Sequence, residues 1–166
     1  MEGLLKTNYP KNKMVVAICW EERGGKETED IVREVENNYK NAFLDLVSIM
    51  HPANLSDEIP GKGSNTAYAA KLVKESIVDA RRIPYEHILV SNFDIDTVVF
   101  PEYFGVLTHT FLTTENPLRA SYQPIPLYVN NIWEAPSFAR VVAFAATFWH
   151  TVKQEKSETA TTFSSH

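Results

Sequence analysis

The sequence predicts an α/β fold with a mostly parallel sheet and helices on its faces. Segments with strand character and segments with helix character alternate from Met14 to Leu112, as in β-α-β units with right-handed crossovers. Polar and acidic residues directly follow several of the apolar strand runs. Ligands of such sheets bind beyond the carboxyl ends of the strands, so these polar residues are the first candidates for a functional site.

The composition is that of an ordinary globular protein. With 166 residues and 44% hydrophobic content, the chain suits one domain with a buried core. A net charge of -5 and the lack of a basic run argue against nucleic acid as a partner. Cys19, the single cysteine, lies in an apolar run, so we expect a buried, reduced thiol and a cytoplasmic setting.

The first half of the chain predicts two strands and two helices. Residues 14–20 are apolar throughout and predict a fully buried strand. A helix that Thr28 can cap follows, and residues 43–50 form the second strand. A loop rich in Pro, Gly and Ser leads to a second helix, capped by Ser64, that ends near Arg82 before a proline.

The second half begins with a short apolar run. Residues 87–93 predict a buried strand, because three strand-favouring residues are consecutive there. We expect a helix from Pro101 to about Leu112. Residues 121–129 look extended, but their two prolines restrict them to an edge strand or an irregular one.

The last predicted helix, residues 136–153, is apolar on nearly every side. We expect it to be buried against the sheet or to lie in a membrane interface. Burial of each large side chain stabilises by about 1.5 to 3 kcal/mol, so Phe148→Asp would unfold or aggregate the chain. The sequence thus predicts one domain over residues 1–166, with a lead-in at 1–13, a core at 14–153 and a loose polar tail at 154–166.

Two acids one residue apart, Asp94 and Asp96, follow the apolar run that ends at Phe93. Side chains of an extended chain alternate, so both carboxylates would point the same way and Ile95 would point into the protein. Like charges this close repel each other unless a cation lies between them, and Mg²⁺ or Mn²⁺ prefers such oxygen ligands. The pair predicts a metal-diphosphate site, and a plain polar loop is the alternative.

Two further candidates stand near predicted strand and helix ends. Lys62 lies in a Gly-Lys-Gly-Ser run before a helix, where free N–H groups, the helix dipole and the lysine can hold a phosphate. Its spacing is not that of a P-loop, and a flexible turn is the alternative. Glu21 follows the first strand and would contact a nucleotide or belong to a solvated charge cluster. His51, like the other histidines, lacks metal-ligand spacing and is read as structural.

Several short motifs occur in a fixed order along the chain: Glu21-Glu22-Arg23, His51-Pro52, Gly61-Lys62-Gly63-Ser64-Asn65, Asp94-Ile95-Asp96-Thr97, Ser121-Tyr122-Gln123-Pro124, Asn130-Asn131-Ile132-Trp133 and Thr162-Phe163-Ser164-Ser165-His166. This ordered set resembles the family 2 glycosyltransferases of the GT-A fold. The resemblance is strongest to bacterial, membrane-associated members related to cellulose-synthase-like enzymes, and it extends over nearly the whole chain.

The resemblance implies a function. Asp94 and Asp96 would bind Mn²⁺ or Mg²⁺ on the diphosphate of a nucleoside diphosphate sugar, with a UDP-sugar favoured. Lys62 would lie near that diphosphate and Glu21 near the nucleoside. The parent enzyme would transfer the sugar to an acceptor hydroxyl at the cytoplasmic face of a membrane.

The chain also departs from the family pattern. The family's first nucleotide-binding strand would precede this sequence, and its general base would follow it. The resemblance therefore implies an incomplete GT-A domain in which no residue acts as the base, and the chain alone would not catalyse transfer. A non-catalytic binding or scaffolding remnant and a nucleotidyltransferase-like enzyme remain as alternatives.

Overall fold

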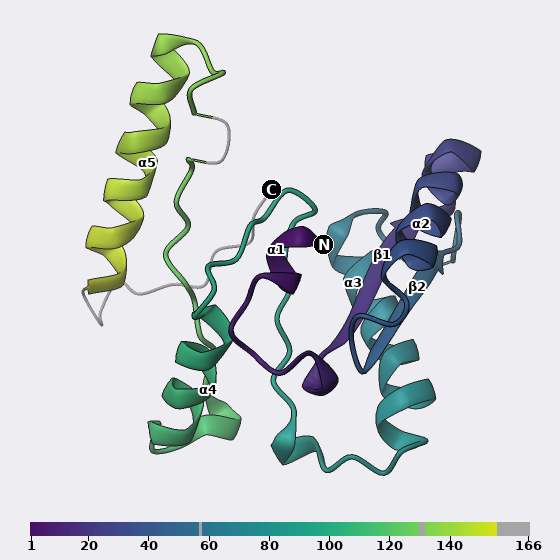
Figure 1. Cartoon of the computed structure of the whole chain (residues 1–166). Helices are drawn as coiled ribbons and strands as arrows, with labels where there is room; N and C mark the ends of the chain where they lie inside the picture. The colour runs from purple at the N-terminus through teal and green to yellow at the C-terminus, as the bar shows by residue number, and fades with distance from the viewer. Residues whose placement is uncertain (57, 130–131, 156–166) are drawn as a thin grey trace. The chain divides into compact units, whose positions relative to one another are not determined.

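The computed structural model describes residues 1–56, 58–129 and 132–155 of a mixed α/β chain (Figure 1). The elements of the described residues, in order, are α1 (Glu2–Leu5), η1 (Lys11–Lys13), β1 (Val15–Glu21), η2 (Glu22–Gly24), α2 (Gly25–Tyr39), β2 (Asp45–His51), α3 (Lys62–Val73), the π-helix η3 (Lys74–Asp79), η4 (Tyr85–His87), α4 (Tyr103–Thr113), η5 (Pro117–Arg119) and α5 (Ser137–Glu155).

The described chain forms two compact units. The first comprises Met1–Phe93 with Val99–Thr108, and the second comprises Asp94–Val98 with the residues from His109 onward. The predicted single domain over residues 1–166 stays a prediction, because two such units can belong to one domain.

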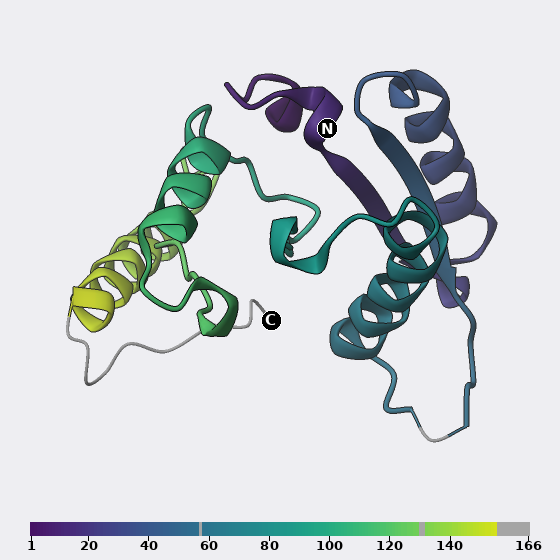
Figure 2. The same cartoon turned by 90° about the horizontal axis from the view of Figure 1, so that it is seen from below.

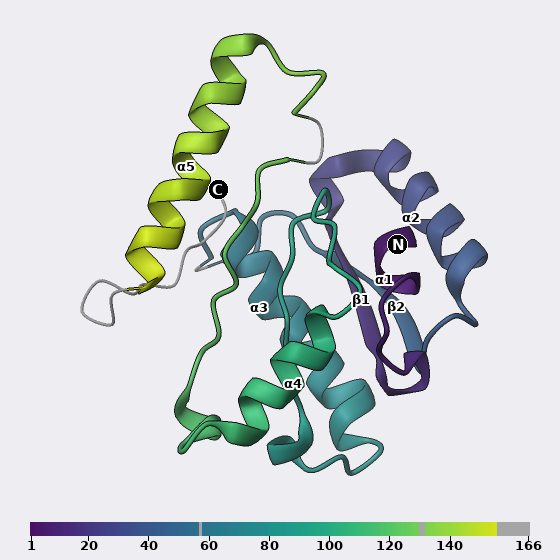
Figure 3. The same ribbon diagram turned by 60° about the vertical axis from the view of Figure 1, so that its left-hand side comes forward.

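A parallel pair of strands forms the centre of the first unit. β1 pairs with β2 in a register that runs from Val15 opposite Asp45 to Glu21 opposite His51. α2 connects the strands and lies on one side of them, and α3 lies on the other side (Figures 1, 2 and 3). The predicted first two strands and their parallel arrangement are confirmed. Within the described residues the sheet has these two strands.

α2 begins at Gly25, three residues before the cap that the sequence predicts. Thr28 does not cap the helix; its Oγ1 donates to the Gly24 carbonyl at 2.9 Å. Val32 is the buried residue of this helix. Near its end, the Glu36 carboxylate accepts the Ser48 N–H of β2 at 3.0 Å, which supplies a partner for a strand amide.

α3 begins at Lys62, two residues before the predicted cap. The helix continues without a break into η3, and the chain turns at Arg82, which adopts φ 55°. Ala69 and Ile77 are buried and lie on one stripe of the helix, because eight residues span little more than two turns. The predicted helix from residue 64 to about 82 is confirmed within two residues at its start.

The predicted strand at residues 87–93 is wrong. Residue 87 ends η4, and residues 88–93 have no regular structure. Val90 is 82% exposed, so this apolar run is not in a core. Strands need a neighbour for their backbone groups, and the run has no strand partner in the described sheet. Aromatic contacts join the end of the run to α4 instead. The centroid of the Phe93 ring lies 5.5 Å from that of Tyr103 and 6.2 Å from that of Phe104.

The fully buried first strand is also a prediction that fails. Ala17 and Cys19 of β1 are exposed, while the residues between and beside them are half-buried. A sheet of two strands leaves part of a strand's surface uncovered, so an apolar run need not be buried on both faces. Partial withdrawal from water raises the pKa of the Cys19 thiol.

α5 is a helix as predicted, but it has no buried residue. Its exposed large apolar side chains are Phe138, Val141, Val142, Phe144, Phe148 and Trp149. The sheet belongs to the first unit and α5 to the second, so burial against the sheet and a place in a membrane interface both stay predictions. Among residues 1–56, 58–129 and 132–155, no helix combines the length and apolar character needed to cross a bilayer.

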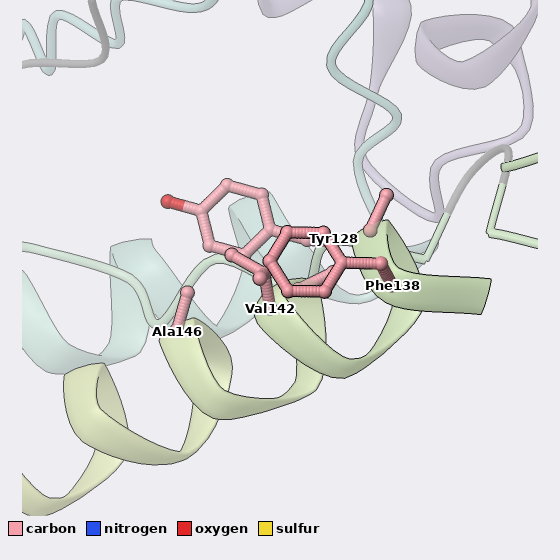
Figure 4. Close-up of a pocket in the computed structure, with 6 residues that line it drawn as sticks. Tyr128, Phe138, Val142 and Ala146 are labelled. Carbon is pink, nitrogen blue, oxygen red and sulfur yellow. The ribbon is translucent and has the colours of Figure 1, made fainter. Parts of the chain in front are cut away.

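The residues before α5 have no strand either. Residues 121–129 are irregular, which agrees with the two prolines that the sequence places there. Tyr128 lies against α5 and borders an apolar hollow of about 430 Å³ with Phe138 and Val142 (Figure 4). The Asn130-Asn131-Ile132-Trp133 motif falls partly outside the described residues, as does most of the tail at 154–166.

Matched isoleucines test the core of the first unit. Ile49 is 7% exposed and Ile59 is 88% exposed. We expect Ile49→Ala to lower the free energy of unfolding by about 2 to 5 kcal/mol, because it leaves a cavity. Ile59→Ala should change it by less than about 0.5 kcal/mol. Urea unfolding followed by circular dichroism measures both, and equal losses would contradict the placement of β2 in the core.

Phe148→Asp tests the exposure of α5. Phe148 is 62% exposed, so we expect the variant to fold with unchanged helix content and to bind less of the apolar dye ANS than the parent chain. Phe43→Asp is the contrasting variant, because Phe43 is 8% exposed and a buried carboxylate without a partner should unfold the first unit. Loss of folding in Phe148→Asp would show that α5 is covered.

Candidate functional site

The carboxyl ends of β1 and β2 form one polar edge in the first unit. The register places Glu21, the last residue of β1, opposite His51, the last residue of β2. Glu21 is half-buried and its carboxylate accepts a hydrogen bond from Arg23 Nε at 2.8 Å. This ion pair is partly exposed to solvent, and such pairs contribute little to stability. Glu21 is therefore located where the sequence predicts it, at the edge formed by the carboxyl ends of the parallel strands.

His51 is a buried polar residue at this edge. Its side chain is 10% exposed, and its Nε2 lies 2.8 Å from Glu58 Oε2. The edge of its ring meets Tyr68 of α3 with 4.9 Å between the centroids. These contacts join the end of β2, the following segment and α3, in agreement with the structural role predicted for this histidine.

The segment between β2 and α3 is fixed by contacts at its start and end. The Ala53 N–H donates to the Glu22 carboxylate at 2.8 Å. Ser64 Oγ lies 2.7 Å from the Ile59 carbonyl and 3.0 Å from the Gly61 carbonyl, to either of which it can donate. These contacts anchor the segment to η2, directly after β1, at one side and to α3 at the other.

Lys62 is the first residue of α3 and is exposed. Gly61 precedes it at φ 158°, a conformation that L side chains rarely adopt. The first N–H groups of a helix have no partner within the helix, and the dipole there favours an anion. The prediction that Lys62 stands at a helix N-terminus is confirmed.

Asp94 and Asp96 belong to the second unit and occupy a turn. The Thr97 N–H donates to the Asp94 carbonyl at 3.0 Å and closes it. Asp94 is half-buried and Asp96 is exposed. Ile95 is 99% exposed, so the prediction that it points into the protein is wrong. That prediction assumed the alternation of a strand, which a tight turn does not keep.

The predicted site residues thus fall in two units, with Glu21 and Lys62 in the first and Asp94 and Asp96 in the second. In the part of the chain that the structure describes, no three His, Cys, Asp or Glu residues are grouped to hold a metal ion. A pair of carboxylates still suits Mg²⁺ or Mn²⁺, since these ions often take one or two carboxylates and fill their other positions with phosphate and water.

Sequence reasoning missed Glu58 and Tyr68 as parts of this edge. Glu58 lies in an irregular segment, and its partner His51 is seven residues away. This spacing belongs to none of the motifs considered, so the sequence does not indicate the contact. Tyr68 could have been found from helix periodicity as a residue facing the sheet, but its contact with a histidine depends on where β2 ends.

A second network precedes the segment that leads to Asp94. Asp79 accepts hydrogen bonds from Lys74 at 2.8 Å and from the Tyr85 hydroxyl at 2.5 Å. Lys74 also lies 5.4 Å from the centre of the Tyr85 ring. The hydrogen bond from Lys74, followed by that from Tyr85, lowers the pKa of Asp79, and the reciprocal bond to Asp79 raises the pKa of Lys74. The network links η3 to η4.

Comparison of the chain with protein families, with curated proteins and with solved structures gave no match.

The Asp79 network predicts a pH dependence of stability. The pKa of Asp79 in the folded chain is lower than its usual 3.8. The stabilisation is therefore present above pH 3.8 and is lost as the pH falls through the lower, folded-state pKa. We expect the urea midpoints of the parent chain and Asp79→Asn to differ at about pH 6 and to converge toward about pH 2.5. Asp30→Asn, a change on the exposed face of α2, should show no such convergence.

Proposed function

We propose that this chain binds a nucleoside diphosphate sugar, with a UDP-sugar favoured, as the donor-binding part of a glycosyltransferase of the GT-A type. The observation that carries the proposal is the parallel β1–β2 pair. Its carboxyl ends meet at one edge, from which the chain passes to Lys62 at the N-terminus of α3. Nucleotides bind at such edges, and a lysine at a helix N-terminus suits a diphosphate.

Asp94 and Asp96 are proposed to hold the divalent ion, Mn²⁺ or Mg²⁺. They lie in a turn in which Asp96 is exposed and Asp94 is half-buried, and an ion held there could take its other oxygen ligands from a diphosphate and water. When bound, the ion would neutralise the charge that develops on the leaving diphosphate. Lys62 would add a positive charge near the same diphosphate. This charge would stabilise the leaving diphosphate more than the intact donor, because the leaving group carries more negative charge.

Glu21 is proposed to lie near the nucleoside. Its hydrogen bond from Arg23 fixes the direction of the carboxylate, which can accept hydrogen bonds from ribose hydroxyls. The acceptor is an alcohol, and the proposal assigns no residue of this chain as its general base. The parent enzyme is proposed to act at the cytoplasmic face of a membrane.

Calorimetry with UDP and Mn²⁺ tests the donor site. We expect the parent chain to bind UDP when Mn²⁺ is present and to lose that binding when EDTA is added. Asp96→Asn and Asp94→Asn should each weaken binding about ten- to a hundredfold, the range for contacts of charged groups. Lys62→Ala should weaken it about tenfold, with or without excess Mn²⁺.

Asp30→Asn provides the matched control, since it removes an equal charge from the exposed surface of α2. It should leave UDP affinity within about twofold of the parent value, because salt screens the effect of a distant surface charge on the site. The proposal fails if the parent chain binds no UDP with Mn²⁺, or if Asp96→Asn and Asp30→Asn bind it equally well.

A further inference from the structure

The segment from Pro52 to Gly61 connects β2 to α3 without regular structure in its described residues. Asn54 adopts φ 60° within it, a left-handed conformation that costs free energy for most residues and is tolerated by asparagine. Ordering such a segment opposes its backbone entropy, at about 1 to 2 kcal/mol per residue. Its conformation, and the position of Lys62 at its far end, therefore depend on the contacts that fix it.

His51 makes the contact in the middle of the segment. Its Nε2 lies 2.8 Å from Glu58 Oε2, four residues before Lys62. His51 is buried, whereas Glu58 is exposed. The packing around His51 therefore fixes its position, and the contact with His51 restrains Glu58. The His51 ring also contacts the Tyr68 ring, with 4.9 Å between the ring centroids and 78° between the ring planes. Tyr68 lies in the second turn of α3.

We propose that His51 is a positioning residue that sets the place of Lys62 for diphosphate binding. One side chain at the end of β2 contacts both the segment before Lys62 and the helix that Lys62 begins. Without it, the chain between the Ala53 contact with Glu22 and the Ser64 contact with Ile59 loses its central support. The role in binding rests on the proposed function, whereas the support of the segment does not.

Hydrogen exchange of the full chain measures the support directly. In His51→Leu we expect backbone amides from Asn54 to Lys62 to exchange about two- to tenfold faster, the effect of one lost hydrogen bond, while those of β1 and β2 keep their rates. His51→Gln retains an N–H donor and should restore slow exchange. His87→Leu makes the same replacement at an exposed histidine and should change nothing in the segment.

Glu58→Leu removes the contact from its exposed side, so it tests the same point even if a replacement at His51 disturbs folding. Fast exchange confined to the segment in both variants supports the proposal. Unchanged exchange in Glu58→Leu, or faster exchange spread evenly over the chain in both variants, overturns it.

UDP affinity in the presence of Mn²⁺ separates this inference from the proposed function. We expect His51→Leu and Glu58→Leu to bind UDP about fivefold more weakly than the parent chain, with His51→Gln recovering the affinity. If the parent chain binds UDP and both leucine variants bind it as tightly as the parent does, the positioning role is refuted and the proposed function stands. If the parent binds no UDP, the proposed function fails and the role in binding fails with it.

Discussion

The parallel pairing of β1 with β2 is the constraint on which the first unit depends. A parallel pair cannot be closed by a tight turn, so a long crossover must connect its strands, and α2 supplies it. Parallel direction also places both carboxyl ends at the same edge. The register then sets Glu21 opposite His51, and the segment toward α3 must start from that edge.

Three acids at this edge each have a local hydrogen-bond partner. Glu21 is bonded to Arg23, the Glu22 carboxylate accepts a backbone N–H, and Glu58 meets His51. Each contact gives an acid a donor, which reduces the negative potential that would otherwise repel a phosphate. An acidic edge can therefore still be compatible with an anionic ligand, provided that these acids keep their partners.

In the second unit, many large apolar side chains are not covered by other residues of the chain. α5 exposes most of its large side chains, although Tyr128 lies against one part of it. The described residues that accompany it are the end of α4, a single η-helix and irregular segments. Irregular chain packs poorly against a helix that is apolar on nearly every side, because its own backbone groups need partners or water.

The sequence by itself determined the elements whose pattern is local. The first two strands agree with the predictions from apolar runs, and the helices that begin at residues 25, 62 and 103 and α5 agree with the predictions from periodicity, caps and prolines. A helix satisfies its backbone bonds within itself, and its amphipathic stripe is read directly from the chain. The position of Lys62 at a helix N-terminus was predicted for the same reason.

The tertiary structure decided what depends on distant partners. The apolar run before Asp94 has strand-favouring residues but no neighbouring strand in the described sheet, so it stays irregular and Ile95 faces solvent. The exposure of Cys19 and the contact of His51 with Glu58 likewise follow from which surfaces α2, α3 and the connecting segment cover. Strand pairing and burial are relations between separate parts of a chain, and no local pattern contains them.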